Sequence, residues 1–328
     1  MKKLFLILNI FIILISAGCS SDAPISSVQT DLLPLLSKIV TGYVKGKDGV
    51  EIYIRIQGRG TPTIVLPGGP GYSFDYLQDT LTPLDTTLQL IYVDLRGCGK
   101  SQGFVDPKKY NFDDMVADIE SVKSVMGLKQ FFIIGHETGG MLAQKYAIKN
   151  PNDVQRMVLM SSPADANDLN VWINSFRNFL PRAAVARIKA YERDSLFIDG
   201  QYSSGYEQEI FNGILSPNYF YNRTSIPENF STPERSWAVY KEIWGQTGYF
   251  DISGSLKTFD TRDDLKGVNA KALILVGQHD YISSFVLESL HNSLANSEMH
   301  MFENAGHFFY LEKHDEFISK IFEFLGKK

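Results

Sequence analysis

Short apolar runs recur along the chain and alternate with longer amphipathic stretches. Residues 113–127 carry apolar side chains at positions 115, 116, 119, 122 and 126, which is helical spacing. Residues 42–58 alternate on both sides of the turn Lys47-Asp48-Gly49, which predicts two paired strands. The remaining runs have the length of buried strands and lie at 63–67, 88–94, 131–135, 156–162, 271–277 and 298–302. Strands that alternate with helices predict an α/β fold, with a mostly parallel twisted sheet flanked by helices.

The alternation stops in the middle of the chain. Residues 165–255 are rich in aromatic side chains and contain all three tryptophans, Trp172, Trp237 and Trp244. We interpret this segment as an inserted helical cap, with residues 41–164 and 256–328 forming the core. Parallel α/β sheets place their sites in loops beyond the carboxyl ends of the strands, so a cap would cover such a site.

The first residues have a different character from the rest. "MKKLFLILNIFIILISAGC" begins with two lysines, continues as an apolar run and ends in small residues and a cysteine. This pattern is typical of a secretory signal, residues 1–18, and "ISAGC" resembles a bacterial lipoprotein box with Cys19 as the lipidated residue. Residues 19–40 would then be a tether to a membrane of the bacterial cell envelope. A plain transmembrane anchor is the alternative, although the apolar run is at the short end for a span.

Composition narrows the class of function. The 328 residues are 44% hydrophobic and 21% charged, which is ordinary for a globular protein. Loss of residues 1–18 removes two lysines and lowers the formal net charge from −5 to −7. A mildly acidic protein gives no electrostatic reason to expect nucleic-acid binding. With Cys19 lipidated, Cys98 is the single remaining thiol, so no internal disulfide is expected.

The segment "FFIIGHETGGMLAQKYA", residues 131–147, has the form of a nucleophile elbow. In this motif a sharp turn between a strand and a helix lifts one side chain into the active site. That residue is normally serine, and here it is Glu137. Ser–His catalysis needs a hydroxyl group that histidine can deprotonate, whereas a glutamate is already ionised at neutral pH.

Several motifs together resemble the α/β-hydrolase family and, more narrowly, its proline iminopeptidase branch. The resemblance spans roughly residues 41–326 and rests on the ordered segments "LPGGPGYSFDYL", "DLRGCGKS", "GHETGG", "GYFDISGSLKTFDTRDDL", "VGQHDYIS" and "NAGHFFYLEK". It implies that Asp280 orients His307, that His307 is the base, and that the amides of Gly69 and Thr138 form the oxyanion hole. Without the resemblance, Asp280 would be interpreted as a helix cap and His307 as a histidine of the hydrophobic core. The family resemblance implies no cofactor.

The chain departs from that branch at four positions. Glu137 replaces the serine, and Pro67 replaces the histidine that usually opens the glycine loop. The glutamates that bind a free amino terminus are replaced by Tyr281 and, by residue counting, Tyr249. A pair of carboxylates has become a pair of phenols, so we do not expect a true aminopeptidase.

Three interpretations of Glu137 follow. It acts as a carboxylate nucleophile or general base in an atypical Glu-His-Asp triad with His307 and Asp280, as aspartate does on the elbow of epoxide hydrolases and haloalkane dehalogenases. Alternatively, two carboxylates keep His307 protonated, and the site binds a ligand without turnover. Third, Glu137, Asp280 and His307 hold a metal ion, although no spacing motif supports this. A peptidase or esterase with its nucleophile elsewhere is a further alternative, for which Ser161 and Ser162 are unsuited by position.

We favour the first interpretation, because the acid, the histidine, both glycine loops and the elbow occur together. The aromatic cap predicts a small, largely apolar substrate. Tyr249, Tyr281 and Trp244 are the expected substrate-binding residues, and no metal is expected. The sequence predicts neither the substrate nor the oligomeric state.

Overall fold

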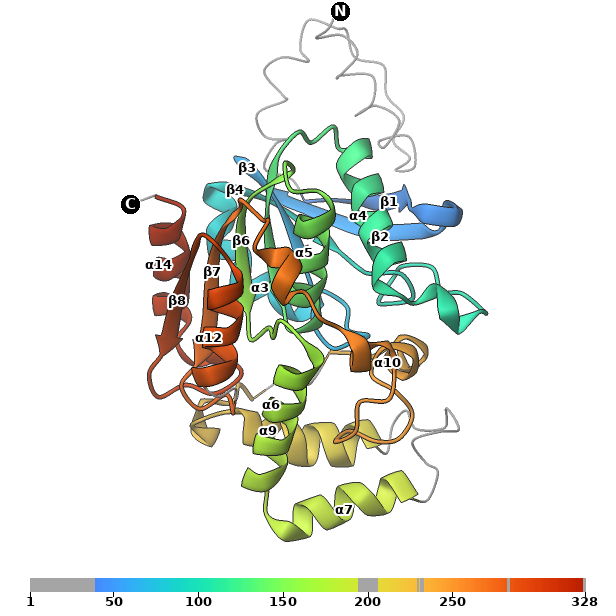
Figure 1. Ribbon diagram of the computed structural model, residues 1–328, viewed down its shortest axis with the longest axis vertical. Helices are drawn as coiled ribbons and strands as arrows, with labels where there is room; N and C mark the ends of the chain where they lie inside the picture. The colour runs from blue at the N-terminus through green and yellow to red at the C-terminus, as the bar shows by residue number, and fades with distance from the viewer. Residues whose placement is uncertain (1–38, 194–205, 229, 231–232, 282–283, 327–328) are drawn as a thin grey trace, which may run out of the picture.

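The computed structural model describes residues 39–193, 206–228, 230, 233–281 and 284–326. Its centre is an eight-stranded sheet in the order β1-β2-β4-β3-β5-β6-β7-β8 (Figure 1). The strands are β1 (Val40–Lys45), β2 (Glu51–Gly58), β3 (Thr61–Leu66), β4 (Leu88–Val93), β5 (Phe131–His136), β6 (Val154–Met160), β7 (Lys271–Gly277) and β8 (Ser297–Phe302). β1 begins one residue inside the segment that we assigned to the tether.

The sheet is parallel from β4 to β8, while the β1–β2 and β2–β4 pairs are antiparallel. The mostly parallel sheet expected from the sequence is therefore confirmed. Its central strands are buried on both faces, which is why they read as continuous apolar runs. In β4 the side chains from Leu90 to Val93 are all fully buried.

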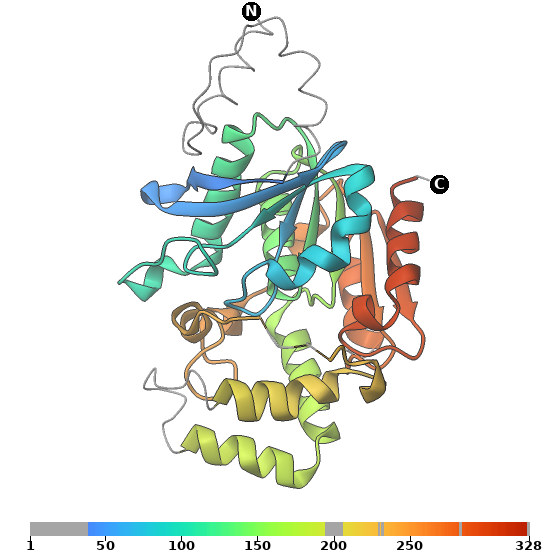
Figure 2. The same cartoon turned by 180° about the vertical axis from the view of Figure 1, so that it is seen from behind.

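Helices cover both faces of the sheet. Helices α4 (Phe112–Val125), α5 (Thr138–Lys149) and α12 (Ser284–Ser293) pack in one hydrophobic cluster (Figure 1). Helices α3 (Asp75–Leu81), α13 (Phe309–Glu312) and α14 (His314–Phe324) contribute to the other cluster, which is seen from behind in Figure 2. Between these layers, the carboxyl ends of β3, β5, β7 and β8 all point toward one end of the molecule.

We call residues 165–255 the cap segment, and its described residues lie at that end (Figures 1 and 2). Its described residues include no β-strand beyond isolated bridges. Its elements are α6 (Ala166–Phe179), α7 (Arg182–Arg193), the π-helical η6 (Glu207–Leu215), α9 (Ser216–Tyr219), η7 (Arg223–Ser225), α10 (Trp237–Ile243) and the start of η8 (Ser255–Thr258). A β-bridge between Asp165 and Asp260 joins the points where the chain leaves and re-enters the core. α11 (Arg262–Leu265) follows in the core.

A buried ion network fixes the loop after β4. The Arg96 side chain is fully buried and donates two hydrogen bonds to Asp118, at 2.6 Å and 2.7 Å, and one to Asp114 at 3.1 Å. Asp94 accepts hydrogen bonds from the amides of Phe74 and Lys100, at 3.0 Å and 2.8 Å. Asp94 therefore holds the segment before α3 against the loop after β4, and Arg96 holds that loop against α4. Neither residue contacts a reacting group.

Replacing Arg96 by methionine is expected to destabilise the fold by about 3–5 kcal/mol, because it leaves the buried Asp118 without its cation, whereas Asp114 keeps its ion pair with Lys47. Chemical denaturation checks this. The exposed pair of Arg187 and Glu209 offers the control, since Arg187→Met should change the unfolding free energy by less than about 1 kcal/mol. Equal effects of the two substitutions would contradict the structural role of Arg96.

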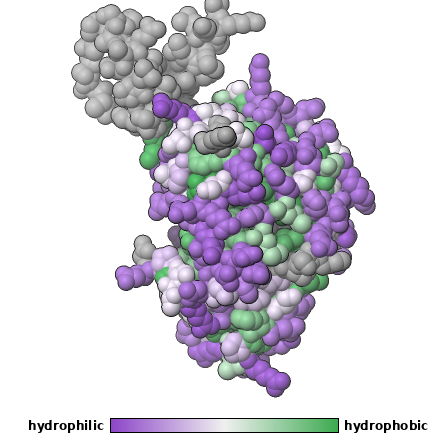
Figure 3. All heavy atoms as spheres, turned by 90° about the vertical axis from the view of Figure 1, so that its left-hand side faces the viewer, coloured by the Kyte–Doolittle hydropathy of each residue, from purple (hydrophilic) through white to green (hydrophobic). Residues whose placement is uncertain are grey.

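The signal, the tether and Cys19 lie outside the described residues. Within the described part of the chain, no helix combines the length and the apolar character needed to cross a bilayer. The face that carries β8 and α14 is mainly hydrophilic, with apolar side chains scattered over it (Figure 3).

Candidate active site

The elbow between β5 and α5 presents Glu137 to the cavity beneath the cap segment. Glu137 has φ 47° and ψ −118°, a conformation that L-residues rarely adopt. The turn is tight, because a Cβ atom at Gly135 would lie 2.5 Å from the carbonyl oxygen of Gly139. The Glu137 amide donates to the carbonyl of Met160 at 2.9 Å, and its carbonyl accepts from Gly140 at 3.0 Å. The strained backbone of Glu137 and the neighbouring glycines together place this side chain beyond the carboxyl end of β5.

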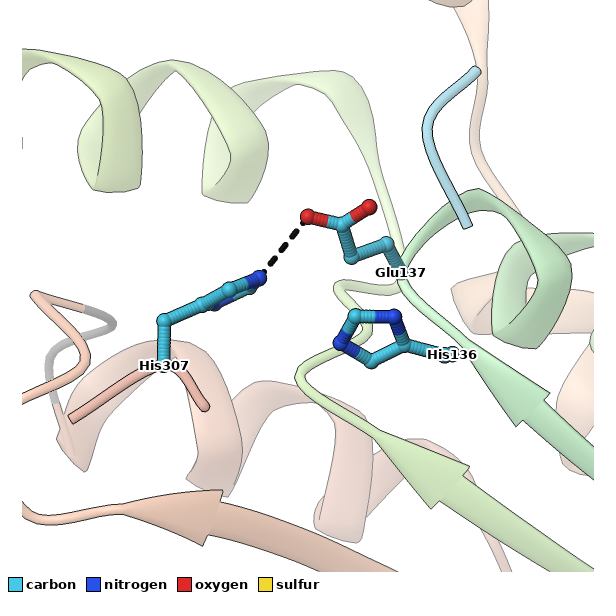
Figure 4. A group of neighbouring side chains, drawn as sticks. All are labelled: His136, Glu137 and His307. Carbon is cyan, nitrogen blue, oxygen red and sulfur yellow. Dashed lines mark hydrogen bonds and ion pairs between the residues drawn. The ribbon is translucent and has the colours of Figure 1, made fainter. Parts of the chain in front are cut away.

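The two carboxylate oxygens of Glu137 have different partners. Oε1 is 2.8 Å from Nε2 of His307 (Figure 4). Oε2 accepts a hydrogen bond of 2.7 Å from the amide of Gly69, one of the two amides expected in the oxyanion hole. A Cβ atom at Gly68 would lie 2.4 Å from Oε2, so the glycine loop approaches as closely as it does only without a side chain there. Thr138, the other expected residue, begins α5 directly after Glu137.

His307 is held in place by Asp280. Its Nδ1 lies 2.6 Å from Oδ1 of Asp280, and Asp280 also accepts a hydrogen bond from the hydroxyl of Ser161. Asp280 and Glu137 contact opposite nitrogens of the same ring, so these three residues do not surround one point. The sequence hypothesis of a metal site made of Glu137, Asp280 and His307 is therefore wrong in its choice of ligands.

The cap segment contacts the same histidine directly. Trp172 of α6 stacks on the His307 ring, with ring centroids 5.4 Å apart and planes 21° apart, and its Nε1 donates to the carbonyl of Asp280 at 2.9 Å. The His307 amide donates to the carbonyl of Tyr219 of α9 at 2.8 Å. Residues of the cap segment and residues of the core therefore both hold the His307 ring in position.

The charges of the site follow from these contacts. Burial alone would lower the pKa of His307, but Asp280 and Glu137 outweigh it and raise that pKa to about 10. Burial alone would raise the pKa of Glu137, but the imidazoles of His136 and His307 and the Gly69 amide lower it to about 2. Near neutral pH the site thus holds a Glu137 carboxylate paired with a His307 imidazolium. His136 is neutral, because burial lowers its pKa to about 3.

The raised pKa of His307 predicts how stability depends on pH. A histidine whose pKa rises from 6.5 to about 10 on folding contributes stability that is complete below pH 6.5 and is lost as pH rises through 10. We expect the free energy of unfolding to fall from pH 7 to pH 10, as measured by denaturant titration at each pH. Glu137→Gln removes one of the two carboxylates and should flatten this dependence. An unchanged slope would contradict the ion pair.

A cavity of about 250 Å³ opens beside Glu137 and His307. Aromatic side chains of the cap segment dominate its cap side, and the lining includes Trp172, Phe211, Tyr219, Phe230, Tyr240, Trp244 and Tyr249. The hydroxyls of Tyr219 and Tyr249 hydrogen-bond to each other. Burial raises the pKa of both phenols, so both stay protonated near neutral pH.

Two of the three expected substrate-binding residues, Tyr249 and Trp244, line this cavity, and Tyr281 does not. Tyr281 has φ 59°, packs on Phe176 and Phe179, and donates its hydroxyl to the carbonyl of Asn218 at 3.0 Å. Its side chain is therefore used to attach α6 and α9 to the core. The phenol that pairs with Tyr249 in the cavity belongs to Tyr219 instead.

Sequence reasoning did not assign roles to Tyr219, Tyr76 or Ser161. Tyr76 accepts from the amide of Gly68 at 2.8 Å and lies 2.7 Å from Nδ1 of His136. Ser161 directly follows β6, the neighbour of β7, and parallel strands end at the same edge of a sheet. That adjacency was the available signal for Ser161. No motif marks Tyr219.

Comparison with known proteins identifies the family to which the fold described above belongs. A family model described as the alpha/beta hydrolase fold matches residues 61–314. The chain belongs to the alpha/beta hydrolase fold family. The match covers the elbow, the acid loop, the histidine loop and the cap segment of this hydrolase.

Relatives within the family include proline iminopeptidases. One from Lactobacillus crispatus is 28% identical over 293 residues, covering 85% of this hydrolase and 96% of the relative. The crystal structure of a proline iminopeptidase from Mycobacterium smegmatis superposes with a TM-score of 0.68 at 20% identity, covering 87% and 97% of the two chains. The crystal structure of VinJ gives 0.70 at 19% identity, covering 88% and 98%. At these identities the solved structures show a shared fold.

Proposed function

We propose that this alpha/beta hydrolase uses Glu137 as a carboxylate nucleophile against a small, largely apolar substrate. The observation that carries the proposal is the split of the carboxylate between two partners, Oε2 on the Gly69 amide and Oε1 on His307. A glutamyl carbonyl carbon is joined to Cβ through one atom, as is the acyl carbon of a seryl ester. The oxyanion hole and histidine of a serine hydrolase therefore fit a glutamyl ester without rearrangement.

The first step forms this ester. A Glu137 oxygen attacks an electrophilic carbon, and the bond from that carbon to the leaving atom breaks with its electron pair. The leaving oxygen takes a proton from a donor that faces the cavity, for which the hydroxyls of Tyr219 and Tyr249 and the imidazolium of His307 are available. An epoxide or an alkyl halide has the required chemistry, and the aromatic lining suits an apolar body.

The second step breaks the ester. Esterification removes the negative charge of Glu137, so the pKa of His307 falls. The ring becomes a neutral base once its proton has passed to the leaving oxygen, directly or by way of a tyrosine hydroxyl, or to solvent when the leaving group is a halide. Water gives a proton to His307 and attacks Cδ, and the amide of Gly69 stabilises the oxyanion that develops at Oε2. The intermediate collapses, and the alcohol leaves with a proton from His307. The Glu137 carboxylic acid that results gives its proton to the neutral His307, which restores the carboxylate and the imidazolium.

His307→Gln is expected to stop the reaction at the ester, because the variant has no base for the water. After incubation with a panel of epoxides and alkyl halides, intact mass spectrometry should show about one adduct per chain, and peptide mapping should place it on Glu137. The double variant Glu137→Gln/His307→Gln is the matched control and should stay unmodified. Absence of any adduct across a broad panel would overturn the proposal.

A second candidate function is ligand binding without turnover. It is favoured by the protonated state of His307, since an imidazolium between two carboxylates cannot accept a proton. It differs from the first candidate in one measurable respect, because the silent site has no activity for Glu137→Gln to remove.

We do not propose the aminopeptidase activity for which the relatives are named. The Ser161 hydroxyl donates to Asp280 and not to the catalytic nitrogen of His307, so it is not an alternative nucleophile. Tethering through a lipid on Cys19 remains a prediction from the sequence.

A further inference from the structure

His136 completes a group of three side chains with ligand atoms facing one another. It precedes Glu137 on the elbow, and its ring lies 5.3 Å from that of His307, centroid to centroid. Figure 4 shows the two rings and the carboxylate arranged around a common space. One ligand atom from each of His136, Glu137 and His307 can be chosen so that all lie within 4.8 Å of one another.

One nitrogen in this group lacks a partner. His136 is 2% exposed, and its Nε2 has no hydrogen-bond partner among the described residues. A buried polar atom without a partner destabilises the folded protein, so such atoms are rare. The other ring nitrogen, Nδ1, is 2.7 Å from the hydroxyl of Tyr76. The ring is therefore held in orientation while one nitrogen stays available.

Both histidines have the outer contacts typical of metal ligands. A metal-binding histidine usually engages a carboxylate, carbonyl or hydroxyl through its second nitrogen, which fixes the ring. Asp280 does this for His307 at 2.6 Å, and Tyr76 does it for His136. The third group, Glu137, offers an oxygen. Two nitrogens and one carboxylate oxygen form a ligand set for Zn²⁺, whereas Mg²⁺ and Ca²⁺ prefer oxygen alone.

We propose that His136, Glu137 and His307 bind a Zn²⁺ ion, with its fourth position open to the cavity. Tetrahedral zinc places ligand atoms ~3.3 Å apart, so the 2.8 Å contact between Glu137 and His307 opens slightly and the more widely spaced ligand atoms draw in around the ion. The bound ion occupies Glu137 and His307, which the nucleophilic reaction needs, so zinc inhibits turnover. This inhibition rests on the proposed function, whereas the binding site rests on geometry alone.

The test measures binding without any substrate, so it succeeds or fails independently of the nucleophilic mechanism. Full-length, untagged protein treated with EDTA is titrated with Zn²⁺ by calorimetry and with Co²⁺ by visible absorption. We expect one ion per chain with a Kd of about 10 µM or tighter, a tetrahedral Co²⁺ spectrum, and no comparable binding of Mg²⁺. No Zn²⁺ or Co²⁺ binding at about 100 µM would overturn the site.

Variants identify the ligands. His136→Gln should weaken binding at least about tenfold, and Tyr76→Phe, which frees the His136 ring, should also weaken it. The matched control is His300→Gln, which removes a surface histidine 2.9 Å from Glu316 and should leave affinity unchanged. Near-UV circular dichroism checks that each variant is folded. A folded His136→Gln protein that binds zinc as tightly as the wild type would disprove the assignment, and Tyr76→Phe provides the test if that variant does not fold.

Discussion

Glu137→Gln is expected to abolish turnover, with a loss in kcat/KM of at least about 10⁴-fold on any substrate that the protein hydrolyses. Glutamine keeps the shape of the side chain and its contact with the Gly69 amide, but an amide oxygen cannot form the ester. The effect should appear in kcat, because cavity lining and apolar contacts are unchanged. Steady-state kinetics and a search for the adduct on the same substrate measure it.

The control is Asp79→Asn, which removes a carboxylate at the exposed rim of the same cavity. It should change kcat/KM by less than about threefold, since rim charges contribute little. The two candidate functions separate here. If Glu137→Gln keeps ligand affinity, as measured by calorimetry, and the wild type turns over none of the panel, the site is silent. Turnover that survives Glu137→Gln would contradict the nucleophilic role.

Glu137→Ser is expected to give the protein an esterase activity that it lacks. The serine hydroxyl would occupy the position of Cγ, the Gly69 amide would become free for a substrate oxyanion, and His307 would lose one of the carboxylates that raise its pKa. All three changes restore the requirements of Ser–His–Asp catalysis. We expect hydrolysis of aryl esters ~10²–10⁴-fold above the wild type, followed by release of the phenolate.

The double variant Glu137→Ser/His307→Gln is the matched control for this gain. It keeps the new hydroxyl and the free amide but removes the base, so the gain should disappear. A folded Glu137→Ser protein without esterase activity would show that the site is not arranged for acyl transfer.

The sequence predicted the parts of the structure that depend on burial and chain order. Strands β3 to β7 could be recognised because burial on both faces makes most of their residues apolar. Asp280 and His307 were assigned through the family resemblance, and their positions agree with it because each follows a strand whose end faces the same edge of the sheet. The elbow at Glu137 was recognised because its glycines mark a turn that other residues cannot form.

The sequence could not predict the directions of side chains within loops. Tyr281 was selected because it directly follows Asp280, but its positive φ turns the ring onto α6, and Tyr219 of α9 occupies the cavity instead. The occupation of the Gly69 amide by Oε2 depends on the rotamer of Glu137, and no motif encodes it. The unpartnered nitrogen of His136 likewise becomes visible only when the loops from β3, β5 and β8 are assembled.

The contacts of Trp172 and Tyr219 with the histidine loop have a consequence for substrate access. The cap segment cannot lift away without losing the stack on His307, the hydrogen bond to Asp280 and the bond from the His307 amide. If the cap segment moved away to admit a molecule, the imidazole of His307 would no longer be aligned. Under the proposed mechanism, cleavage of the ester would therefore require the cap segment to be in contact with the core, an arrangement that also limits the access of bulk water to the bound intermediate.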